Sequence, residues 1–283
     1  MRRACPENDH CRPSGPLRRR EFLKTANALA AVAVAAAMLA PLPAAAAPTG
    51  ETYPAATGEG SGDRTMNRKV AGGSPTSIFA APAAAQISFD GAGTDVRCAG
   101  SQISASWVIT AKHCNSPSLK SVRLGSTYLE AHGAVRTVAA RYASPMGDLL
   151  LLRLSTPYSG ATVGLSASLP ASGTAGKVYG WGYQAEGSGS MSYFLKTADV
   201  TVTGPGSDSY GGASVSTRSQ SGHPIGGDSG GPLMVDGKLA GVLSESSVLP
   251  AGTTADYSQY YSDHASIARN LDWITRISGV IGS

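Results

Sequence analysis

The sequence is poor in charge, and the charge it has is unevenly placed. Only 15% of its 283 residues are charged, with a formal net charge of +4. From Val70 onward 13 basic residues balance 13 acidic ones, so the excess lies in the first 69 residues. The part of the chain from Val70 onward has no net charge and therefore does not attract nucleic acid or acidic lipid electrostatically. We therefore expect no nucleic-acid partner and, once the N-terminal segment is removed, no membrane partner.

Helical periodicity is almost absent after Val70. Short β-rich runs alternate there with turn signals, and the 35 glycines suit a chain with many turns. One helix is predicted at about 266–278, where Ile267, Leu271, Ile274 and Ile277 share a face. Asp236-Gly237 predicts a type I′ hairpin turn. Strands are predicted at 85–89, 102–110, 121–124, 135–141, 149–154, 177–180, 198–203, 233–235 and 238–243.

The N-terminal segment resembles a bacterial export signal. The run Arg19–Lys24 (RREFLK) resembles the twin-arginine motif and precedes an uncharged, alanine-rich stretch from Thr25 to Ala47. These 23 residues are enough to span a bilayer, but Pro41, Pro43 and the alanine-rich end favour removal by cleavage. We interpret residues 1–47 as a signal peptide and expect a secreted bacterial protein.

Residues 48–69 form a different kind of segment. They are rich in Gly, Pro, Thr and Glu and lack apolar periodicity, which is typical of a flexible linker or a short propeptide. The segment ends in Arg68-Lys69, directly before Val70. A dibasic pair in a linker is usually solvated charge, so only its position before Val70 gives the pair a further meaning.

The most informative segment is Pro224–Pro232 (PIGGDSGGP), which presents Ser229 on a glycine-rich turn. A serine nucleophile needs a base, and His113 lies after a strand-like run in the segment TAKHC. The only aspartate between His113 and Gly180 is Asp148, which would orient the imidazole. The chain order of these candidates is therefore His, Asp, Ser.

The serine segment also fits a different arrangement. GDSGG satisfies the G-x-S-x-G elbow of α/β-hydrolases. Their order of Ser, Asp, His would have to use Asp256 or Asp263 with His264, which crowds both partners into a few residues. That fold also needs alternating helices and strands, and the sequence lacks that pattern.

Together these segments resemble the trypsin and chymotrypsin family of secreted serine proteases, over residues 70–283. Val70–Gly73 is similar to the mature N-terminus of the family, Cys98–Cys114 to its first disulfide loop and Gly180–Gly182 to its mid-chain landmark. The resemblance implies an all-β fold of two antiparallel six-stranded β-barrels and a C-terminal α-helix. The first barrel would span about 70–160, the second about 161–265 and the helix about 266–278.

The resemblance also implies a role for each site residue. Ser229 would be the nucleophile, His113 the general base and Asp148 the group that orients it. The backbone N–H groups of Gly227 and Ser229 would form the oxyanion hole. No cofactor and no metal ion are implied.

Activation and a disulfide are implied by the same resemblance. Cleavage after Lys69 by another protease would free the α-amine of Val70, which would then pair with Asp228. Cys98 and Cys114 are the cysteines left after the leader, which contains Cys5 and Cys11, is lost. They are expected to pair in an oxidising exterior.

Substrate choice is less determined. His223 stands six residues before Ser229, where trypsin-like members hold an aspartate, so trypsin-like specificity is not expected. A histidine there could favour an acidic substrate side chain, or it could be capped by Tyr210 or a backbone carbonyl. Ser244 matches the family serine beside the buried aspartate and the substrate backbone, or it is an ordinary strand serine.

These patterns predict a secreted, monomeric serine endopeptidase made as a zymogen. Its partners would be a protein or peptide substrate and an activating protease. Two alternatives stay open: a serine esterase, which shares the acyl-transfer chemistry, and a catalytically inactive, protease-like binding module.

Overall fold

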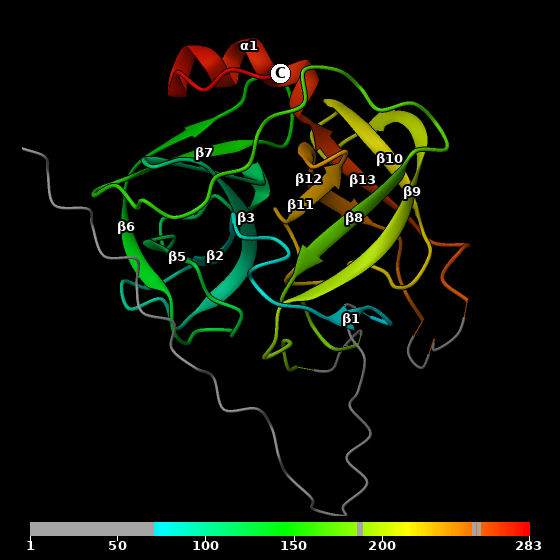
Figure 1. The fold of residues 1–283 in the computed structure, drawn as a ribbon, viewed down its shortest axis with the longest axis horizontal. Helices are drawn as coiled ribbons and strands as arrows, with labels where there is room; N and C mark the ends of the chain where they lie inside the picture. The colour runs from blue at the N-terminus through cyan, green and yellow to red at the C-terminus, as the bar shows by residue number, and fades with distance from the viewer. Residues whose placement is uncertain (1–70, 186–188, 251–252, 254–255) are drawn as a thin grey trace, which may run out of the picture. The chain divides into compact units, whose positions relative to one another are not determined.

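The computed structural model describes residues 71–185, 189–250, 253 and 256–283 (Figure 1). The predicted signal peptide, the predicted linker and Val70 lie outside these residues. The elements of the first half are β1 (Ser74–Pro75), β2 (Ala84–Ser88), β3 (Val96–Ser104), β4 (Trp107–Thr110), β5 (Ser121–Leu124), β6 (Ala134–Ala143) and β7 (Leu150–Leu154). Those of the second half are β8 (Ala175–Gly180), β9 (Lys196–Ser207), β10 (Ala213–Ser219), β11 (Pro232–Val235), β12 (Lys238–Ser246), β13 (Tyr261–Ser266) and α1 (Ile267–Ser278).

The first barrel is closed by six antiparallel strands in the order β2-β3-β4-β7-β6-β5, with β5 pairing back to β2. Strand β7 reads LLLRL, and all of it except Arg153 is buried. A continuous apolar run of this kind is typical of a strand that is covered on both faces. The run therefore marks β7 as a core strand of the domain.

The second barrel uses six strands in the order β8-β9-β10-β13-β12-β11, and the pairing of β8 with both β11 and β9 closes it. The short strand β1 adds to the free edge of β9, where Ser74 lies opposite Thr197. Asp236 and Gly237, between β11 and β12, have φ angles of 50° and 74°. Two positive φ values fit the predicted type I′ turn.

Helix α1 ends the domain. The side chain of Ser266 caps its N-terminus by accepting a hydrogen bond from the Arg269 N–H, and Gly279, with φ of 75°, ends it. Ile267 and Ile274 on the predicted apolar face are fully buried. In the part of the chain that the structure describes, no helix is long and apolar enough to cross a membrane.

The predicted fold class, two antiparallel six-stranded β-barrels with a C-terminal helix, is confirmed. Some strands differ from their predicted bounds. The run predicted as one strand at 102–110 is divided between β3 and β4, because the chain turns at Ala105-Ser106. Strands β10 and β13, which pair with each other, were not predicted.

Candidate active site

The three residues predicted to act together lie beyond the ends of strands. His113 is in a single 3-10 turn after β4, Asp148 precedes β7, and Ser229 lies in the connection between β10 and β11. Since β4 and β7 are antiparallel neighbours, the end of β4 lies beside the start of β7. The first barrel thus supplies the imidazole and the carboxylate, and the second supplies the hydroxyl.

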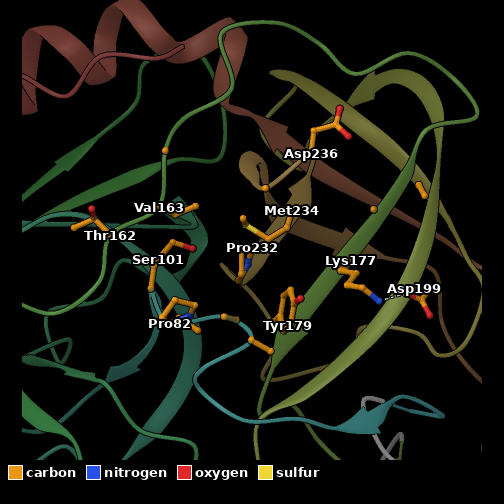
Figure 2. A pocket seen from close by; sticks show the side chains of 18 residues that line it. Pro82, Ser101, Thr162, Val163, Lys177, Tyr179, Asp199, Pro232, Met234 and Asp236 are labelled. Carbon is orange, nitrogen blue, oxygen red and sulfur yellow. Dashed lines mark hydrogen bonds and ion pairs between the residues drawn. The ribbon is translucent and has the colours of Figure 1, made fainter.

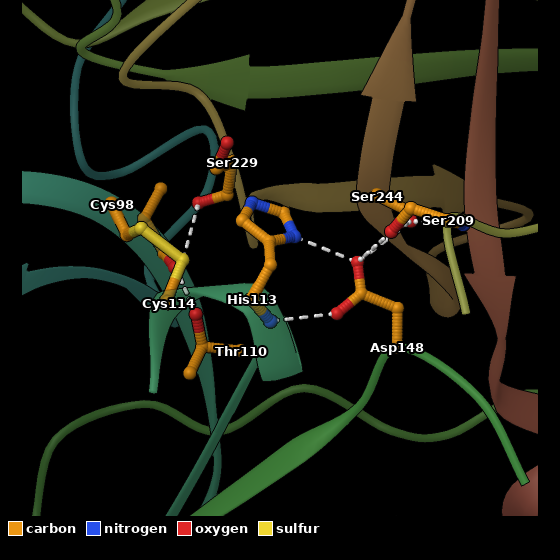
Figure 3. Close-up of a disulfide and its surroundings, with 9 residues drawn as sticks. Cys98, Thr110, His113, Cys114, Asp148, Ser209, Ser229 and Ser244 are labelled. Atoms are coloured by element: carbon orange, nitrogen blue, oxygen red, sulfur yellow. Dashed lines mark hydrogen bonds and ion pairs between the residues drawn. A yellow bond between two sulfur atoms is a disulfide. The ribbon is translucent and has the colours of Figure 1, made fainter. Parts of the chain in front are cut away.

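Asp148 holds the imidazole of His113 in place (Figure 3). The Nδ1 atom of His113 is 2.7 Å from Asp148 Oδ2, and the backbone N–H of His113 donates to Oδ1 at 2.9 Å. Although burial acts to raise the pKa of Asp148, hydrogen bonds from His113 and Ser244 outweigh it, so the pKa lies below its ordinary value. An ionised carboxylate makes Nδ1 the donor and leaves Nε2 able to accept a proton.

Ser229 lies in a turn that depends on glycine. Gly227 has φ of 88°, in the left-handed region that favours glycine. Neither the Gly227 N–H nor the Ser229 N–H donates to any described residue. The Ser229 carbonyl accepts a hydrogen bond from the Ala99 N–H at 2.8 Å, which ties this turn to β3 of the first barrel.

Figure 3 shows Ser229 and His113 in one view of the site. Within the described residues no hydrogen bond joins them. Such catalytic hydrogen bonds are often long or poorly aligned without substrate and tighten when it binds. Among the described residues, the structure therefore joins the His113 imidazole to the Asp148 carboxylate and leaves the Ser229 hydroxyl without a hydrogen bond to the imidazole.

A disulfide joins Cys98 and Cys114, as predicted, with a Cα–Cα distance of 6.5 Å. It lies next to His113, and Cys114 Sγ is 3.9 Å from the Ser229 carbonyl oxygen. This is a packing contact, because a disulfide sulfur carries no proton to donate. The two sulfurs and the His113 ring have the spacing of metal ligands, but sulfurs bonded to each other are not thiolates.

Hydroxyl groups from the second barrel also reach Asp148. Ser244 Oγ donates to Asp148 Oδ2 at 2.6 Å, which places it where the family resemblance implied. The register of β12 against β13 shifts between Leu243 and Glu245, so Ser244 stands at the irregularity. Ser209 Oγ lies 3.1 Å from the same carboxylate oxygen. Ser209 was not predicted as a site residue, since its surroundings resemble an ordinary turn.

Asp228 is buried behind the Ser229 turn. Its Oδ1 accepts from the Gly182 N–H at 2.7 Å and its Oδ2 from the Ile225 N–H at 3.1 Å. Burial raises the pKa of Asp228 to about 6, and the two backbone hydrogen bonds oppose this. Val70, its predicted partner, lies outside the described residues. The next residue, Ala71, is buried and pairs with His223, five residues before Asp228.

His223 occupies a closed position. It is fully buried, with Nδ1 2.8 Å from Ser219 Oγ and Nε2 2.8 Å from the Ser247 carbonyl oxygen. The carbonyl requires a proton on Nε2, and the Ser219 hydroxyl can then donate to Nδ1 of a neutral ring. Burial also lowers the pKa of His223. Of the two candidate caps, the backbone carbonyl is the one present, and Tyr210 is not.

A cavity of about 480 Å³ lies elsewhere in the domain (Figure 2). Its walls include residues 80–84 and 162–164 and parts of β8 and β11, and the ion pair of Lys177 with Asp199 stands at its edge. His113, Asp148 and Ser229 do not line it. Most of its lining is small and apolar, and no histidine is among the described residues that line it.

Comparison with known proteins agrees with this geometry. The family model described as Trypsin matches residues 70–274. Trypsin alpha of Drosophila erecta is 32% identical over 74% of this chain and 87% of its own length, and trypsin alpha of Drosophila melanogaster is 30% identical over 76% and 90%. The chain belongs to the trypsin family of serine proteases.

Solved structures show the same relationship. Neuropsin, a serine protease expressed in the limbic system of mouse brain, superimposes with a TM-score of 0.57 and 26% identity, over 69% of this chain and 94% of its own. Human heparin binding protein gives a TM-score of 0.63 and 25% identity, over 75% and 98%. Membership of this family implies a serine endopeptidase scaffold and protein substrates.

Proposed function

We propose that the domain starting at Val70 is a secreted serine endopeptidase that uses His113, Asp148 and Ser229. The observation that carries the proposal is the 2.7 Å contact of His113 Nδ1 with the buried Asp148 carboxylate. It is supported by the serine turn, in which the N–H groups of Gly227 and Ser229 donate to no described residue. Because Nδ1 carries the proton that it donates to Asp148, the unprotonated Nε2 is the atom that acts as the base. Membership of the trypsin family supports the same assignment.

The reaction would proceed in two acyl transfers. Ser229 Oγ attacks the carbonyl carbon of the peptide bond while His113 Nε2 takes its proton, and the negative oxygen is stabilised by the N–H groups of Gly227 and Ser229. The proton then passes from His113 to the amide nitrogen, so the C–N bond breaks and an acyl enzyme remains. Water, deprotonated by His113, attacks the acyl carbon, and the imidazolium returns the proton to Ser229 Oγ as the ester bond breaks and the acid leaves.

The substrate side chain that precedes the cleaved bond is proposed to be uncharged. If His223 lies at the bottom of the substrate pocket, it offers no free N–H to a substrate carboxylate. Both of its ring nitrogens are already hydrogen bonded within the protein. The ring is neutral and also gives no attraction for lysine or arginine. This favours small or apolar side chains over the acidic preference that a histidine could otherwise provide.

Activation is proposed to depend on cleavage after Lys69. Within the described chain, the Ala71 carbonyl accepts from the His223 N–H at 2.9 Å, so the residue after Val70 is held near the Asp228 turn. A new ammonium at Val70 would compensate the carboxylate that burial disfavours. Residues 1–47 are proposed to direct export by the twin-arginine route of a bacterium, and another protease would make the activating cut.

The binding-module alternative gains little from the comparisons. The name of one structural relative says that it binds heparin. From Val70 onward this chain has equal numbers of basic and acidic residues, which does not favour a polyanion. The complete set of His113, Asp148 and Ser229 instead favours catalysis.

The test compares hydrolysis of peptide amides and of small esters by the protein cut after Lys69. We expect amide hydrolysis, and a loss of several orders of magnitude in Ser229→Ala, His113→Ala and Asp148→Asn, because each removes part of one unit. Hydrolysis of esters without amides would favour the esterase alternative. Folded protein with neither activity would favour the binding module.

A further inference from the structure

We propose that the connection between β9 and β10, Asp208–Gly212, is a positioning element for Asp148, in which Ser209 supplies a second hydroxyl to the carboxylate. This inference rests on the proposed function. It concerns how residues of the second barrel hold the Asp148 carboxylate, which belongs to the first barrel. The evidence is a set of contacts between residues that lie 60 and 61 positions apart in the chain.

The donors around the carboxylate are fully assigned within the described residues. Oδ1 accepts from the His113 N–H at 2.9 Å, and Oδ2 lies near His113 Nδ1 at 2.7 Å, Ser244 Oγ at 2.6 Å and Ser209 Oγ at 3.1 Å. A carboxylate offers about four lone-pair sites. Three donors therefore converge on Oδ2 and one on Oδ1, so removal of Ser209 leaves Oδ2 held by His113 and Ser244 alone.

Ser209 also contacts the other serine. Its Oγ is 2.9 Å from Ser244 Oγ, and its backbone N–H donates to Ser244 Oγ at 3.1 Å. Ser244 uses its single proton on Asp148, so the Ser209 hydroxyl can donate to either Asp148 or Ser244. An ionised acceptor makes the stronger hydrogen bond. Ser209 thus supports the carboxylate directly and holds the oxygen of its neighbour.

Asp208 anchors the same turn to the backbone of Asp148. It is 4% exposed, and its Oδ2 accepts from the Asp148 N–H at 2.9 Å. Its Oδ1 accepts from the N–H groups of Tyr210 and Gly212 at 2.9 and 2.8 Å, which closes the turn. Two consecutive residues of the second barrel therefore hold the peptide and the side chain of Asp148.

The segment 208–212 also contacts the chain next to His113. The Lys112 Nζ atom lies 4.5 Å from the centre of the Tyr210 ring, and Lys112 precedes His113. Lys112 also donates to the Ser144 carbonyl at 3.1 Å. The segment 208–212 is therefore in contact with the chain beside both the imidazole and the carboxylate, as a positioning element requires.

The test compares Ser209→Ala with Ser207→Ala, a matched change two residues away whose hydroxyl touches no triad residue. A net hydrogen bond corresponds to roughly a 2- to 12-fold effect. We expect kcat to fall by about 3- to 10-fold in Ser209→Ala with KM unchanged, and Ser209→Thr to restore it. The double change with Ser244→Ala should be non-additive, since both hydroxyls act on one oxygen.

A second measurement does not require activity. In the folded Ser229→Ala background, the NMR signal of the proton between His113 and Asp148 should move when Ser209 becomes Ala and stay in place when Ser207 does. If Ser209→Ala matches Ser207→Ala in both kcat and proton shift, the positioning role is wrong. If the cut wild-type protein hydrolyses no amide, the proposed function fails, and the proton shift still decides this inference.

Discussion

The Oδ1 atom of Asp228 accepts a 2.7 Å hydrogen bond from the backbone N–H of Gly182. The close approach of the Asp228 carboxylate explains why glycines stand on both sides of Trp181. A Cβ atom at Gly182 would lie 2.3 Å from Asp228 Oδ2, and one at Gly180 would lie 2.1 Å from Oδ1. The carboxylate behind the Ser229 turn therefore fills the space that any larger residue would need.

Gly182→Ala should displace Asp228 and with it the turn of Ser229. Overpacking of this kind typically costs about 1–3 kcal/mol. We expect a lower free energy of unfolding in urea and a large loss of titratable active sites. Gly91→Ala is the matched control, because nothing lies within 4 Å of a Cβ there. Equal stability and activity in the two variants would show that Asp228 does not need this space.

The uncut precursor should be nearly inactive. Activation requires a new α-amine at Val70, and an extended chain cannot supply that charge to the buried Asp228. Trace trypsin should produce activity, with N-terminal sequencing reading Val-Ala-Gly-Gly. A precursor with both Arg68→Gln and Lys69→Gln should resist this activation. Full activity in a chain that still carries Arg68-Lys69 would contradict the proposed mechanism.

Loss of the disulfide should destabilise the domain without removing the triad. The bridge between Cys98 and Cys114 has a sequence separation of 16, for which the chain-entropy model gives about 3 kcal/mol. The paired change Cys98→Ser with Cys114→Ser should lower the unfolding free energy by about that amount. Intact-mass analysis of the exported wild-type protein should find no free thiols. Two free thiols would show that the bridge does not form.

Stability should fall in acid, in part through His264. This residue is fully buried and bonds Thr217 through Nε2, and burial lowers its pKa to about 3. Because the unfolded imidazole titrates near 6.5, its contribution is complete above pH 6.5 and is lost as pH falls toward 3.

The measurement is urea unfolding of the Ser229→Ala protein at pH 7 and pH 4.5. The free energy of unfolding should fall less between pH 7 and pH 4.5 in His264→Gln than in the parent protein, by roughly 2–3 kcal/mol. His132→Gln, a change at an exposed histidine, serves as the control. An unchanged acid loss in His264→Gln would show that this histidine is not responsible.

Elements with strong local patterns were predictable from the sequence. The strand at 121–124 and the helix at 267–278 carry apolar periodicity, and the motifs around His113 and Ser229 located the candidate site. Strand β10 reads ASVSTRS, which carries little apolar signal. Side chains of this strand form hydrogen bonds to the neighbouring strand β13, among them those of Ser214 and Ser216 to Asp263. Such long-range polar contacts leave no periodic trace.

Ser209 was not predictable for the same reason. It contacts Asp148 only because β9 and β10 bring their connection to the first barrel, so its role depends on topology and not on neighbouring residues. The environment of His223 depends likewise on Ser247, 24 positions away. The sequence alone indicated that His223 differs from the trypsin pattern. Its neutral state could be inferred only once the fold showed its hydrogen-bond partners.

The most direct test of the central claim is labelling of the protein cut after Lys69 with a fluorophosphonate, and then mass mapping of the adduct. Such a reagent reacts with a serine that a neighbouring base has activated. The account predicts one adduct, on Ser229, that forms rapidly in the wild-type protein and is almost absent in His113→Ala. No adduct on Ser229, or equal labelling in His113→Ala, would contradict it.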